Sequence, residues 1–492
     1  MSGADAPRGG SKGERAGQAG KQAEPEAKSE ARSGSGQTQT LLILGARGDL
    51  TARLLLPGLG GLVASSSLTD LFLVGSDRGE EDDEAWQAVV AQAFAAGEAS
   101  GPAVDTVVRN ARYVAADATD EGDLRRLLEC RRGRLTLYFA LPAAVTVEAC
   151  RALARIGVPD GTRLVLEKPF GTDAASATAL NELLHGFVPE DHVHRVDHFL
   201  GMSTVLNILG VRFANRVVEP LLSAEHVEAV DIVFDETLGL EGRAGFYDVT
   251  GALRDMIQSH LLQVLAIAAM PPPSTLEQLE VRDSKAHILR ATRVWDDRPE
   301  RFSRRARYTA GTIDGRSLPS YVDEEGIDPA RGTETLAEVV FAVDTWRWAG
   351  VPFRVRSGKA IGSPRQEVTF WFKAPQHVPD GLTGEARANR LHIGLGPRRL
   401  QMDININGPG DPSTISPVTL DTRFGPGELF EYGEVLRGVL EDEKPLSVRD
   451  DMSVESWRIV QPVLDAWRDG RVPLEEYPAG SAGPAAWEAR TP

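Results

Sequence analysis

The stretch Thr40-Leu41-Leu42-Ile43-Leu44-Gly45-Ala46-Arg47-Gly48-Asp49-Leu50 decides the fold class of this chain. The apolar run that ends at Leu44 predicts a short buried strand, and the residues after Leu50 have helical character. A strand, a glycine turn and a helix in this order form the first unit of a dinucleotide-binding fold. In that unit the missing side chains of Gly45 and Gly48 let a pyrophosphate reach the helix N-terminus. A plain tight turn is the competing interpretation, because Gly-x-x-Gly-Asp is not the commonest form of this fingerprint.

The same alternation of strands and helices continues to about residue 201. The sequence predicts strands at 71–75, 135–141, 164–167 and 192–196, and helices at 84–96, after 145 and at 175–186. Repeated β-α units of this length imply a parallel, doubly wound sheet. We therefore predict an α/β, Rossmann-like dinucleotide-binding domain at residues 39–201.

The pattern changes in the second half of the chain. Helical segments at 205–215 and 253–270 mix with alternating apolar and polar runs at 226–234, 367–372 and 400–406. Alternation with a period of two favours a mostly antiparallel sheet that has one face in solvent or against a partner. We predict that residues 202–492 form an α+β domain for substrate binding and oligomerisation. Its large sheet is expected to form the interface of a homo-oligomer, a dimer or a tetramer.

Residues 1–38 consist mainly of Gly, Ser, Ala, Gln, Lys and Glu. With almost no large apolar side chain, this segment cannot bury enough surface to offset the entropy of ordering it. We predict a disordered tail, whose role the sequence does not indicate.

Composition narrows the functional classes. The chain has 492 residues, 42% of them hydrophobic, which suggests a soluble protein with two domains. A net charge of −17 disfavours nucleic acid and anionic membrane surfaces as partners. The two cysteines, Cys130 and Cys150, lack metal-ligand spacing, so we expect reduced thiols and no metal site. No apolar run has transmembrane length and no signal peptide is apparent, so a cytoplasmic location is expected.

The residues best suited to catalysis follow the strand predicted at 192–196. Asp197 and His198 come at its carboxyl end, where open parallel sheets place their chemistry, and strand geometry predicts that they point to opposite faces. A second histidine, His260, lies at the head of the strongly apolar helix predicted at 253–270. Our hypothesis is that the fold brings Asp197 and His260 together over a bound cofactor. The alternative for His260 is a hydrogen-bonded core histidine.

Four motifs, in one order, resemble the glucose-6-phosphate dehydrogenase family. They are Gly45-x-x-Gly48-Asp49-Leu50, Glu167-Lys168-Pro169-Phe170-Gly171, Arg195-Val196-Asp197-His198-Phe199-Leu200-Gly201 and Arg254-Asp255-Met256-x-Gln258-x-His260-Leu261-Leu262-Gln263. The resemblance extends from about residue 40 to 485, which is nearly everything but the tail.

The resemblance implies an oxidoreductase that transfers hydride from C1 of glucose 6-phosphate to NADP. The product would be 6-phosphogluconolactone, and the reaction the first step of the pentose phosphate pathway. Removing the O1 proton as the hydride leaves requires a base with a pKa of about 7. That base would be His260, with Asp197 orienting it and stabilising the imidazolium. Lys168 would contact both a sugar hydroxyl and the coenzyme, and Pro169 would form a coenzyme-responsive hinge for which a cis peptide is one alternative.

The resemblance also assigns the other ligand contacts. The coenzyme would contact Gly45, Gly48, Asp49, Arg78, Lys168 and Pro169, and the sugar phosphate would contact Lys168, His198, Glu236, Asp255 and Lys359. Arg78 matches the arginine that reads the adenosine 2′-phosphate of NADP, which suits that dianion in charge and geometry. The preceding residue, Asp77, instead suits a ribose diol. NADP is therefore the first prediction and NAD the second.

The sequence departs from the family at the phosphate end of the substrate site. Phe199 and Met202 replace a tyrosine and a lysine that hold the substrate phosphate in the family. Hydrogen bonds to charged groups contribute roughly 1.5–3 kcal/mol each, so this loss would weaken a phosphorylated substrate by roughly two to four orders of magnitude. The candidates for compensation are His198, Lys359 and Arg365.

Two alternatives therefore stay open. One is an NAD(P)-dependent dehydrogenase of another sugar or sugar phosphate, and the other is a non-catalytic nucleotide-binding homologue. Retention of Asp197, Lys168 and His260 argues against the second alternative, because a binding module needs no base.

Overall fold

The computed structural model describes residues 38–65, 68, 70–408, 410–425, 427, 429–441 and 447–488. The tail predicted at residues 1–38 lies outside the described residues, apart from Thr38. Among the described residues, no helix has the length and apolar character needed to cross a membrane.

The first sheet has the strand order of a doubly wound dinucleotide-binding fold. Within the described part of the chain its seven strands are ordered β18-β6-β5-β4-β1-β2-β3. They are β1 (Gln39–Leu44), β2 (Leu71–Asp77), β3 (Arg112–Ala115), β4 (Arg134–Phe139), β5 (Arg163–Glu167), β6 (Val193–Val196) and β18 (Ser447–Val448). All neighbours from β1 to β6 pair in parallel, and β18 pairs antiparallel with β6. The prediction of a Rossmann-like α/β fold is therefore confirmed.

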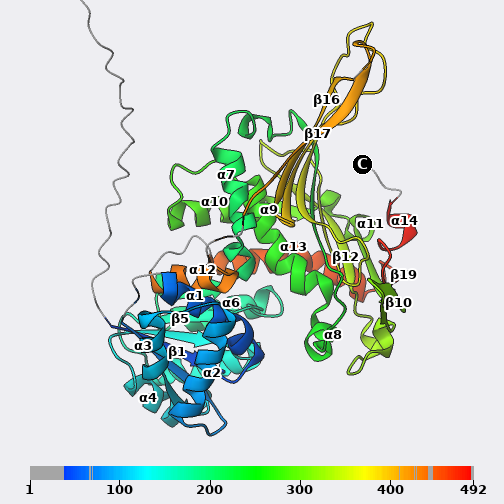
Figure 1. Cartoon of the computed structure of the whole chain (residues 1–492). Coiled ribbons are helices and arrows are strands. Elements are labelled where there is room, and N and C mark those ends of the chain that lie inside the picture. Colours follow the sequence, from blue (N-terminus) through cyan, green and yellow to red (C-terminus); the bar gives the residue numbers. More distant parts are fainter. Residues whose placement is uncertain are drawn as a thin grey trace, which may run out of the picture. The chain divides into compact units, whose positions relative to one another are not determined.

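Helices cover both faces of this sheet (Figure 1). They are α1 (Leu56–Ser65), α2 (Asp83–Ala96), α3 (Pro102–Asn110), α4 (Glu121–Glu129), α5 (Ala143–Ile156) and α6 (Ala174–His185), with the π-helical turn η1 (Thr51–Leu55) before α1. Leu41 and Ile43 of β1 belong to the buried cluster that contains Leu59 of α1. Leu42 and Leu44 belong to a second cluster with residues of α5 and α6. The run at 41–44 is continuously apolar because successive side chains point to opposite faces and both faces are buried.

The second half contains the large, mostly antiparallel sheet that the sequence predicts. In the described residues this ten-stranded sheet has the order β17-β16-β15-β14-β7-β13-β12-β9-β19, with β8 paired to β12. Its strands are β7 (Val227–Asp235), β8 (Thr292–Val294), β9 (Ser303–Thr309), β12 (Leu336–Val343), β13 (Phe353–Gly358), β14 (Gln366–Phe372), β15 (Arg390–Gly396), β16 (Arg399–Asn407), β17 (Ile415–Arg423) and β19 (Leu474–Pro478). The pairs β7–β13 and β9–β19 are parallel.

A layer of helices packs against this sheet. It includes α7 (Ser203–Phe213), η5 (Leu253–Leu261), α9 (Leu262–Ala269), α10 (Gln278–Ala291) and α13 (Asp450–Arg468). All eight residues of α9 are buried, because the helix lies among the sheet, α10 and the other helices of one large apolar cluster. The apolar sequence at 262–269 therefore reflects complete burial.

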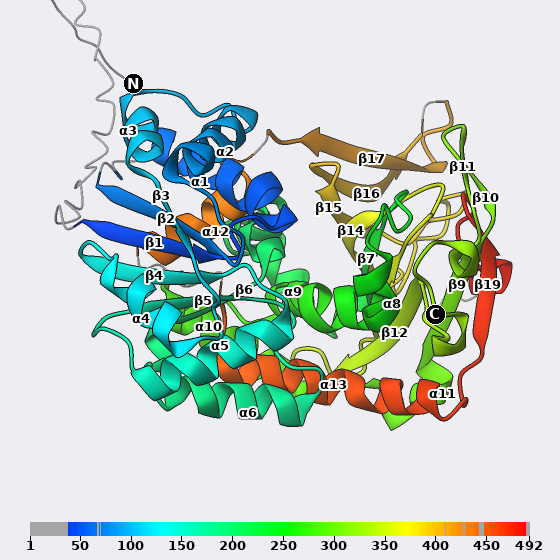
Figure 2. The ribbon, with the colours of Figure 1, turned by 90° about the horizontal axis from the view of Figure 1, so that it is seen from below.

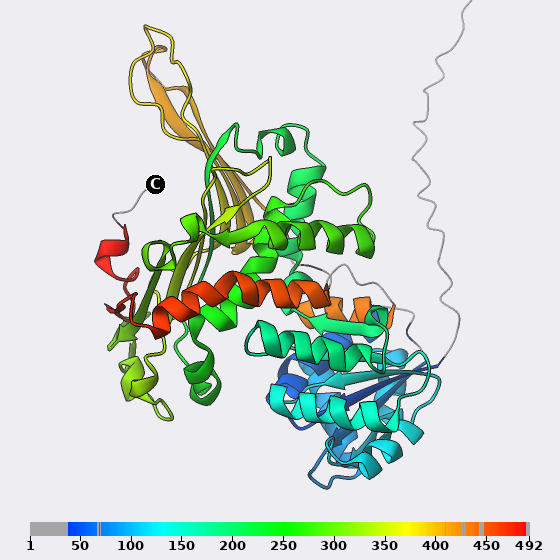
Figure 3. The same ribbon diagram turned by 180° about the vertical axis from the view of Figure 1, so that it is seen from behind.

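Segments near the C-terminus return to the first sheet. Helix α12 (Glu431–Leu440) packs on α1 so closely that a Cβ on Gly58 would lie 2.6 Å from the backbone nitrogen of Gly433. Strand β18 pairs Ser447 with Val196 and Val448 with Arg195, and α13 lies beside α6 (Figure 2 and Figure 3). Strand β6, which leads to Asp197, is therefore held on both edges. The domain boundary predicted at residue 201 stays a prediction. The first sheet also includes β18, which comes from much later in the chain.

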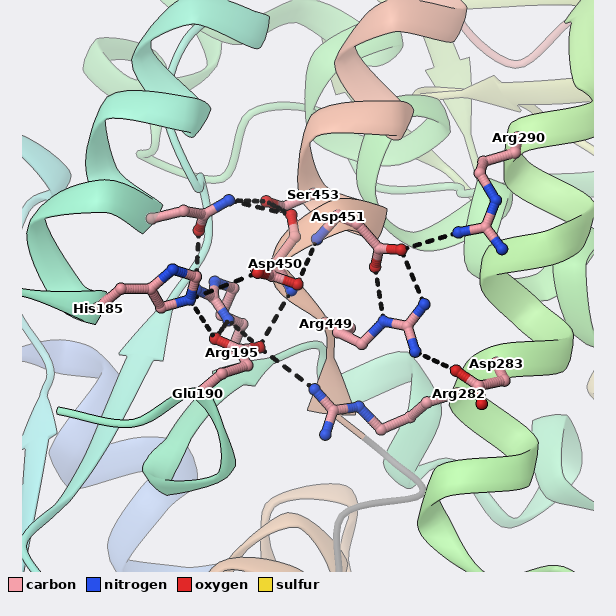
Figure 4. A network of polar contacts seen from close by, with 11 residues as sticks. His185, Glu190, Arg195, Arg282, Asp283, Arg290, Arg449, Asp450, Asp451 and Ser453 are labelled. Atoms are coloured by element: carbon pink, nitrogen blue, oxygen red, sulfur yellow. Dashed lines mark hydrogen bonds and ion pairs between the residues drawn. The ribbon is translucent and has the colours of Figure 1, made fainter.

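A polar network centred on Glu190 joins β6, α10 and the start of α13 (Figure 4). The Glu190 carboxylate accepts hydrogen bonds from Arg195 at 2.8 and 3.0 Å, from Arg282 at 3.3 Å and from the backbone nitrogen of Asp450 at 3.1 Å. His185 lies 3.2 Å from Glu190 and 3.4 Å from Asp450. One carboxylate thus ties β6, the strand before Asp197, to α10 and α13.

Candidate active site

Asp197 and His260 are in direct contact. Nδ1 of His260 lies 2.5 Å from Oδ1 of Asp197, and the two side chains are 1% and 3% exposed. Asp197 follows β6, and His260 lies in the last turn of η5. The structure brings together the two residues that the sequence predicts to meet.

Asp197 and His198 do not follow the alternation expected of a strand. Strand β6 ends at Val196, and the 3-10 turn η3 (His198–Gly201) begins with the Asp197 side chain accepting the backbone N–H of Phe199 at 3.0 Å. The His198 ring centre lies 4.7 Å from that of His260. Both residues therefore contact His260, and the prediction of opposite faces is wrong because the chain turns directly after Val196.

The electrostatics of the pair leave His260 neutral and Asp197 ionised near neutral pH. Burial raises the pKa of Asp197, but the attraction of the carboxylate to the imidazolium form of His260 and the hydrogen bond between the two side chains outweigh burial and lower the pKa to about 2. Burial lowers the pKa of His260, and Asp197 opposes that shift. Since Nδ1 faces the carboxylate, we assign the proton to Nδ1, which leaves Nε2 as the basic nitrogen. Among the described residues Nε2 has no hydrogen-bond partner.

Lys168 lies next to this pair through its contact with η5. It follows β5, its peptide bond with Pro169 is cis, and its ammonium donates to both Oδ1 and the backbone oxygen of Asp255 at 2.8 Å. Burial raises the pKa of Asp255, but the charge of Lys168 outweighs burial and lowers it. Asp255 and His260 lie on the same π-helical segment, so η5 positions both side chains.

Glu236 and Lys359 form a second ion pair, 2.9 Å long, beside Asp255. They follow β7 and β13, which are parallel neighbours, so their carboxyl ends meet at one edge of the large sheet. Nζ of Lys359 lies 5.2 Å from the ring centre of Tyr247, and its charge adds to the lowering of the pKa of Asp255. The structure thus joins Lys168, Asp255, Glu236 and Lys359 in one cluster of alternating charges.

The phosphate end predicted for the substrate site is apolar or neutral. Phe199 stacks on His260 with ring centres 4.2 Å apart, and Met202 packs against the large apolar cluster. His198 stacks on Tyr432 at 5.7 Å, and burial lowers its pKa to about 3, so it is neutral at physiological pH. Arg365 lies in another cavity, which none of the other predicted site residues lines. Of the three candidates for compensation, only Lys359 brings a positive charge to this site.

The coenzyme residues predicted from the first unit lie where β1 and β2 end. Gly45 has a φ of +93°, and a Cβ there would lie 2.2 Å from the carbonyl oxygen of Ala140. Its backbone nitrogen bonds to the Ser76 oxygen at the end of β2. Gly48 continues the turn, Asp49 is exposed and pairs with Arg53 at 3.3 Å, and Arg78 is exposed just after β2.

Three groups near the site were not found from the sequence. Tyr138 donates a hydrogen bond to Glu167, whose pKa burial raises to about 7. Tyr432 comes from α12, far along the chain, and no local pattern connects it to His198. Lys285 is fully buried on α10, and its Nζ has no hydrogen-bond partner among the described residues. Lys285 lies four residues after Val281 and three before Ile288, and both of these apolar residues are buried on α10. The helical periodicity of the sequence could therefore have predicted that Lys285 is buried.

A Rossmann-type domain whose strand ends face a buried carboxylate–imidazole pair is typical of the class of dinucleotide-dependent dehydrogenases. Family models agree with this class. The model for the glucose-6-phosphate dehydrogenase NAD binding domain matches residues 42–207, and that for the C-terminal domain matches residues 209–491. The chain belongs to the glucose-6-phosphate dehydrogenase family, and it is an oxidoreductase with a nicotinamide-dinucleotide-binding domain.

Individual relatives support this membership over nearly the whole chain. Glucose-6-phosphate 1-dehydrogenase of Gluconobacter oxydans is 38% identical over 462 residues, which covers 90% of this chain and 94% of that protein. The enzyme of Dickeya dadantii is 34% identical over 92% of this chain and 95% of its own length. A solved structure of glucose-6-phosphate dehydrogenase in complex with glucose 6-phosphate has a TM-score of 0.82 at 28% identity, covering 92% of this chain and 96% of that chain.

Proposed function

We propose that this chain oxidises C1 of glucose 6-phosphate and transfers the hydride to a nicotinamide dinucleotide, forming 6-phosphogluconolactone in the first step of the pentose phosphate pathway. The observation that carries the proposal is the buried contact between His260 and Asp197, beside the ion pair of Lys168 and Asp255. The names and substrate of the relatives point in the same direction.

His260 acts as the base in this proposal. Its Nε2 takes the O1 proton of the sugar while the C1 hydride leaves, and Asp197 holds the ring through Nδ1 and stabilises the imidazolium. Lys168 orients the sugar hydroxyl, since its ammonium lies between the end of β5 and η5. The nicotinamide ring, when bound, accepts the hydride.

The residues at the end of β1 fit a dinucleotide. The turn lacks side chains at Gly45 and Gly48 and leads into η1 and α1, whose N-terminal end attracts a pyrophosphate. Asp49, Lys168 and Pro169 complete the predicted coenzyme contacts. Arg78 supports NADP, the coenzyme that the sequence predicts first, and its neighbour Asp77 supports NAD.

The sugar phosphate would lie along the charged cluster. Asp255 and Glu236 accept from sugar hydroxyls, Lys359 carries the positive charge for the phosphate, and His198 contributes a neutral imidazole. This assignment gives the phosphate one cation where the family resemblance implies more.

A dehydrogenase of another sugar, or of another sugar phosphate, is the second candidate function. It is favoured by Phe199 and Met202, which pack into apolar surroundings and present no hydroxyl or ammonium. A non-catalytic homologue is disfavoured, because the contact between Asp197 and His260 serves no purpose in a module that only binds nucleotide.

We further propose a cytoplasmic enzyme that forms a homo-oligomer, a dimer or a tetramer, through its large sheet. Ile406 on β16 and Leu420 on β17 are 44% and 56% exposed, which supports an interface on these strands.

Initial rates of coenzyme reduction test the proposed function. The purified chain is assayed at saturating NADP, and separately at saturating NAD, with glucose 6-phosphate titrated beside glucose, and a His260→Asn variant serves as the control. The proposal expects saturation by glucose 6-phosphate at sub-millimolar concentration and almost no rate in the variant. Equal rates with glucose and glucose 6-phosphate would favour the second candidate. No turnover with either sugar would contradict the proposed function, and the second candidate would then be tested with other sugars and sugar phosphates.

A further inference from the structure

Asp77 places a carboxylate where the glycine turn meets the end of β2. Its Oδ1 accepts the backbone N–H of Arg78 at 2.7 Å, and its Oδ2 accepts that of Arg47 at 3.4 Å. The backbone of Asp77 bonds to Ala116 after β3, which fixes the position of the residue. The side chain is therefore oriented by the glycine turn itself, beside the expected path of the adenosine ribose.

The charge around this carboxylate is strongly negative. The segment from β2 into α2 carries Asp77, Glu80, Glu81, Asp82, Asp83 and Glu84. The cations on this side are Arg47, Arg78 and Arg112. Arg47 pairs with Glu81 at 3.4 Å, and Arg112 pairs with Asp83. Two of the three guanidinium groups are therefore already matched with carboxylates of the same segment.

Of these three arginines, Arg78 is the one that forms no ion pair within the described part of the chain. Hydrogen bonds from Thr119 hold the pKa of Asp117 below its usual range, and the Arg78 guanidinium adds to this lowering. The Arg78 guanidinium is thus close enough to act on Asp117, which follows β3, while the Asp77 carboxylate is bonded to the backbone N–H groups of Arg47 and Arg78. A 2′-phosphate bound beside the glycine turn would therefore meet the negative charge of Asp77.

We infer that Asp77 is the specificity residue for the coenzyme and that this chain binds NAD in preference to NADP. The carboxylate accepts hydrogen bonds from the 2′- and 3′-hydroxyls of the adenosine ribose and repels a 2′-phosphate dianion. This reverses the order of the two coenzymes predicted from Arg78. The inference rests on the dinucleotide site of the proposed function, and it does not depend on which sugar is oxidised.

Fluorescence titrations of the full chain with NADH and with NADPH, without any sugar, test the inference. The wild type is expected to bind NADH more tightly than NADPH by roughly 10- to 100-fold, the effect of hydrogen bonds to a charged group. Asp77→Asn keeps an oxygen acceptor for the Arg78 N–H but loses the charge, so it should bind NADPH more tightly and NADH less tightly. Asp77→Ala should do the same, with Arg78 then available to the 2′-phosphate.

Glu80→Ala is the matched control, because it removes one exposed carboxylate three residues away. It should leave the ratio of the two affinities within about threefold of the wild type. Tighter NADPH binding by the wild type, or an unchanged ratio in Asp77→Asn, would overturn the inference while leaving the proposed function intact. Binding of neither coenzyme would overturn both, whereas preferred NADH binding without turnover of glucose 6-phosphate would contradict the proposed function only.

Discussion

Nδ1 of His260 and Oδ1 of Asp197 lie 2.5 Å apart, although the two residues come from different halves of the chain. Asp197 follows the last parallel strand of the first sheet, and His260 lies in the last turn of the π-helix η5 of the second half. The pair is buried, so the base and the acid that orients it exist only when both halves are packed. Catalysis and folding are thereby coupled at this contact.

Replacing Asp197 by Asn tests the role of the carboxylate. The amide has the same shape but cannot stabilise the imidazolium, so kcat should fall by roughly 10²–10⁴-fold. Coenzyme affinity should stay within about twofold, because the adenosine and pyrophosphate contacts lie at the ends of β1 and β2. Initial rates together with coenzyme titration measure both quantities, and near-normal kcat would remove Asp197 from the mechanism.

The pH profile of kcat/KM reports on His260. The base must be neutral, and burial lowers the pKa of His260, so the acid limb of the wild type should have its midpoint below about 6.5. Asp197 opposes this lowering, so the pKa of His260 should fall further in the Asp197→Asn variant. The acid limb of the residual activity should therefore lie at a still lower pH than in the wild type. A limb that moves to higher pH in the variant would contradict the assignment of this titration to His260.

A lysine at position 202 should restore part of the phosphate site. Met202→Lys adds one cation beside Phe199, so the KM for glucose 6-phosphate should fall by roughly 10- to 100-fold while that for glucose stays unchanged. Met202→Gln, which has similar length and no charge, is the control. An equal effect of both variants would show that the phosphate does not lie near position 202.

Glu190→Gln tests the network that supports the strand before Asp197. Arg195 is fully buried and Arg282 nearly so, and both would lose the charge of their shared acceptor. The free energy of unfolding should fall by about 1–3 kcal/mol in denaturant titrations. Glu148→Gln removes an exposed pair with Arg151 and should change it by less than about 1 kcal/mol. An equal loss of unfolding free energy in both variants would show that the network around Glu190 stabilises the protein no more than an exposed ion pair does.

Lys285→Met should stabilise the protein, most of all at lower pH. Burial lowers the pKa of Lys285 from 10.5 to about 7, so the folded chain must hold a buried charge below about pH 7. Between these two pKa values the unfolded state binds one proton more than the folded state. The free-energy cost of burying Lys285 therefore decreases as the pH rises. The variant should gain about 1–4 kcal/mol at pH 6, and less at pH 9. A gain that grows with pH would contradict this explanation.

Much of the fold could be predicted from local patterns. The apolar run that ends at Leu44 predicted the short buried strand β1, and the alternation at 226–234 and 367–372 predicted β7 and β14. The segment 97–134 gave no prediction, although it forms α3, β3 and α4. Strand β3 has only four residues, and one of them is buried, so the strand is too short to show either the helical or the strand periodicity of apolar residues.

The site could be predicted only as far as its motifs extend. The meeting of Asp197 with His260 followed from two motifs and the fold class. The turn after Val196, which directs His198 toward His260, depends on the capping of Phe199 by Asp197. Pairing of β18 with β6 and stacking of Tyr432 on His198 join residues more than 230 positions apart, and a single sequence contains no local signal for such contacts.

Transfer of the hydrogen from C1 is the central claim, and isotopic labelling tests it most directly. Glucose 6-phosphate deuterated at C1 is incubated with the enzyme and the coenzyme that binds more tightly, and the reduced coenzyme is examined by mass spectrometry. We expect one deuterium per reduced nicotinamide, and none when His260→Asn replaces the wild type or when the label is at C2. Reduced coenzyme without deuterium, or no reduction at all, would contradict the account.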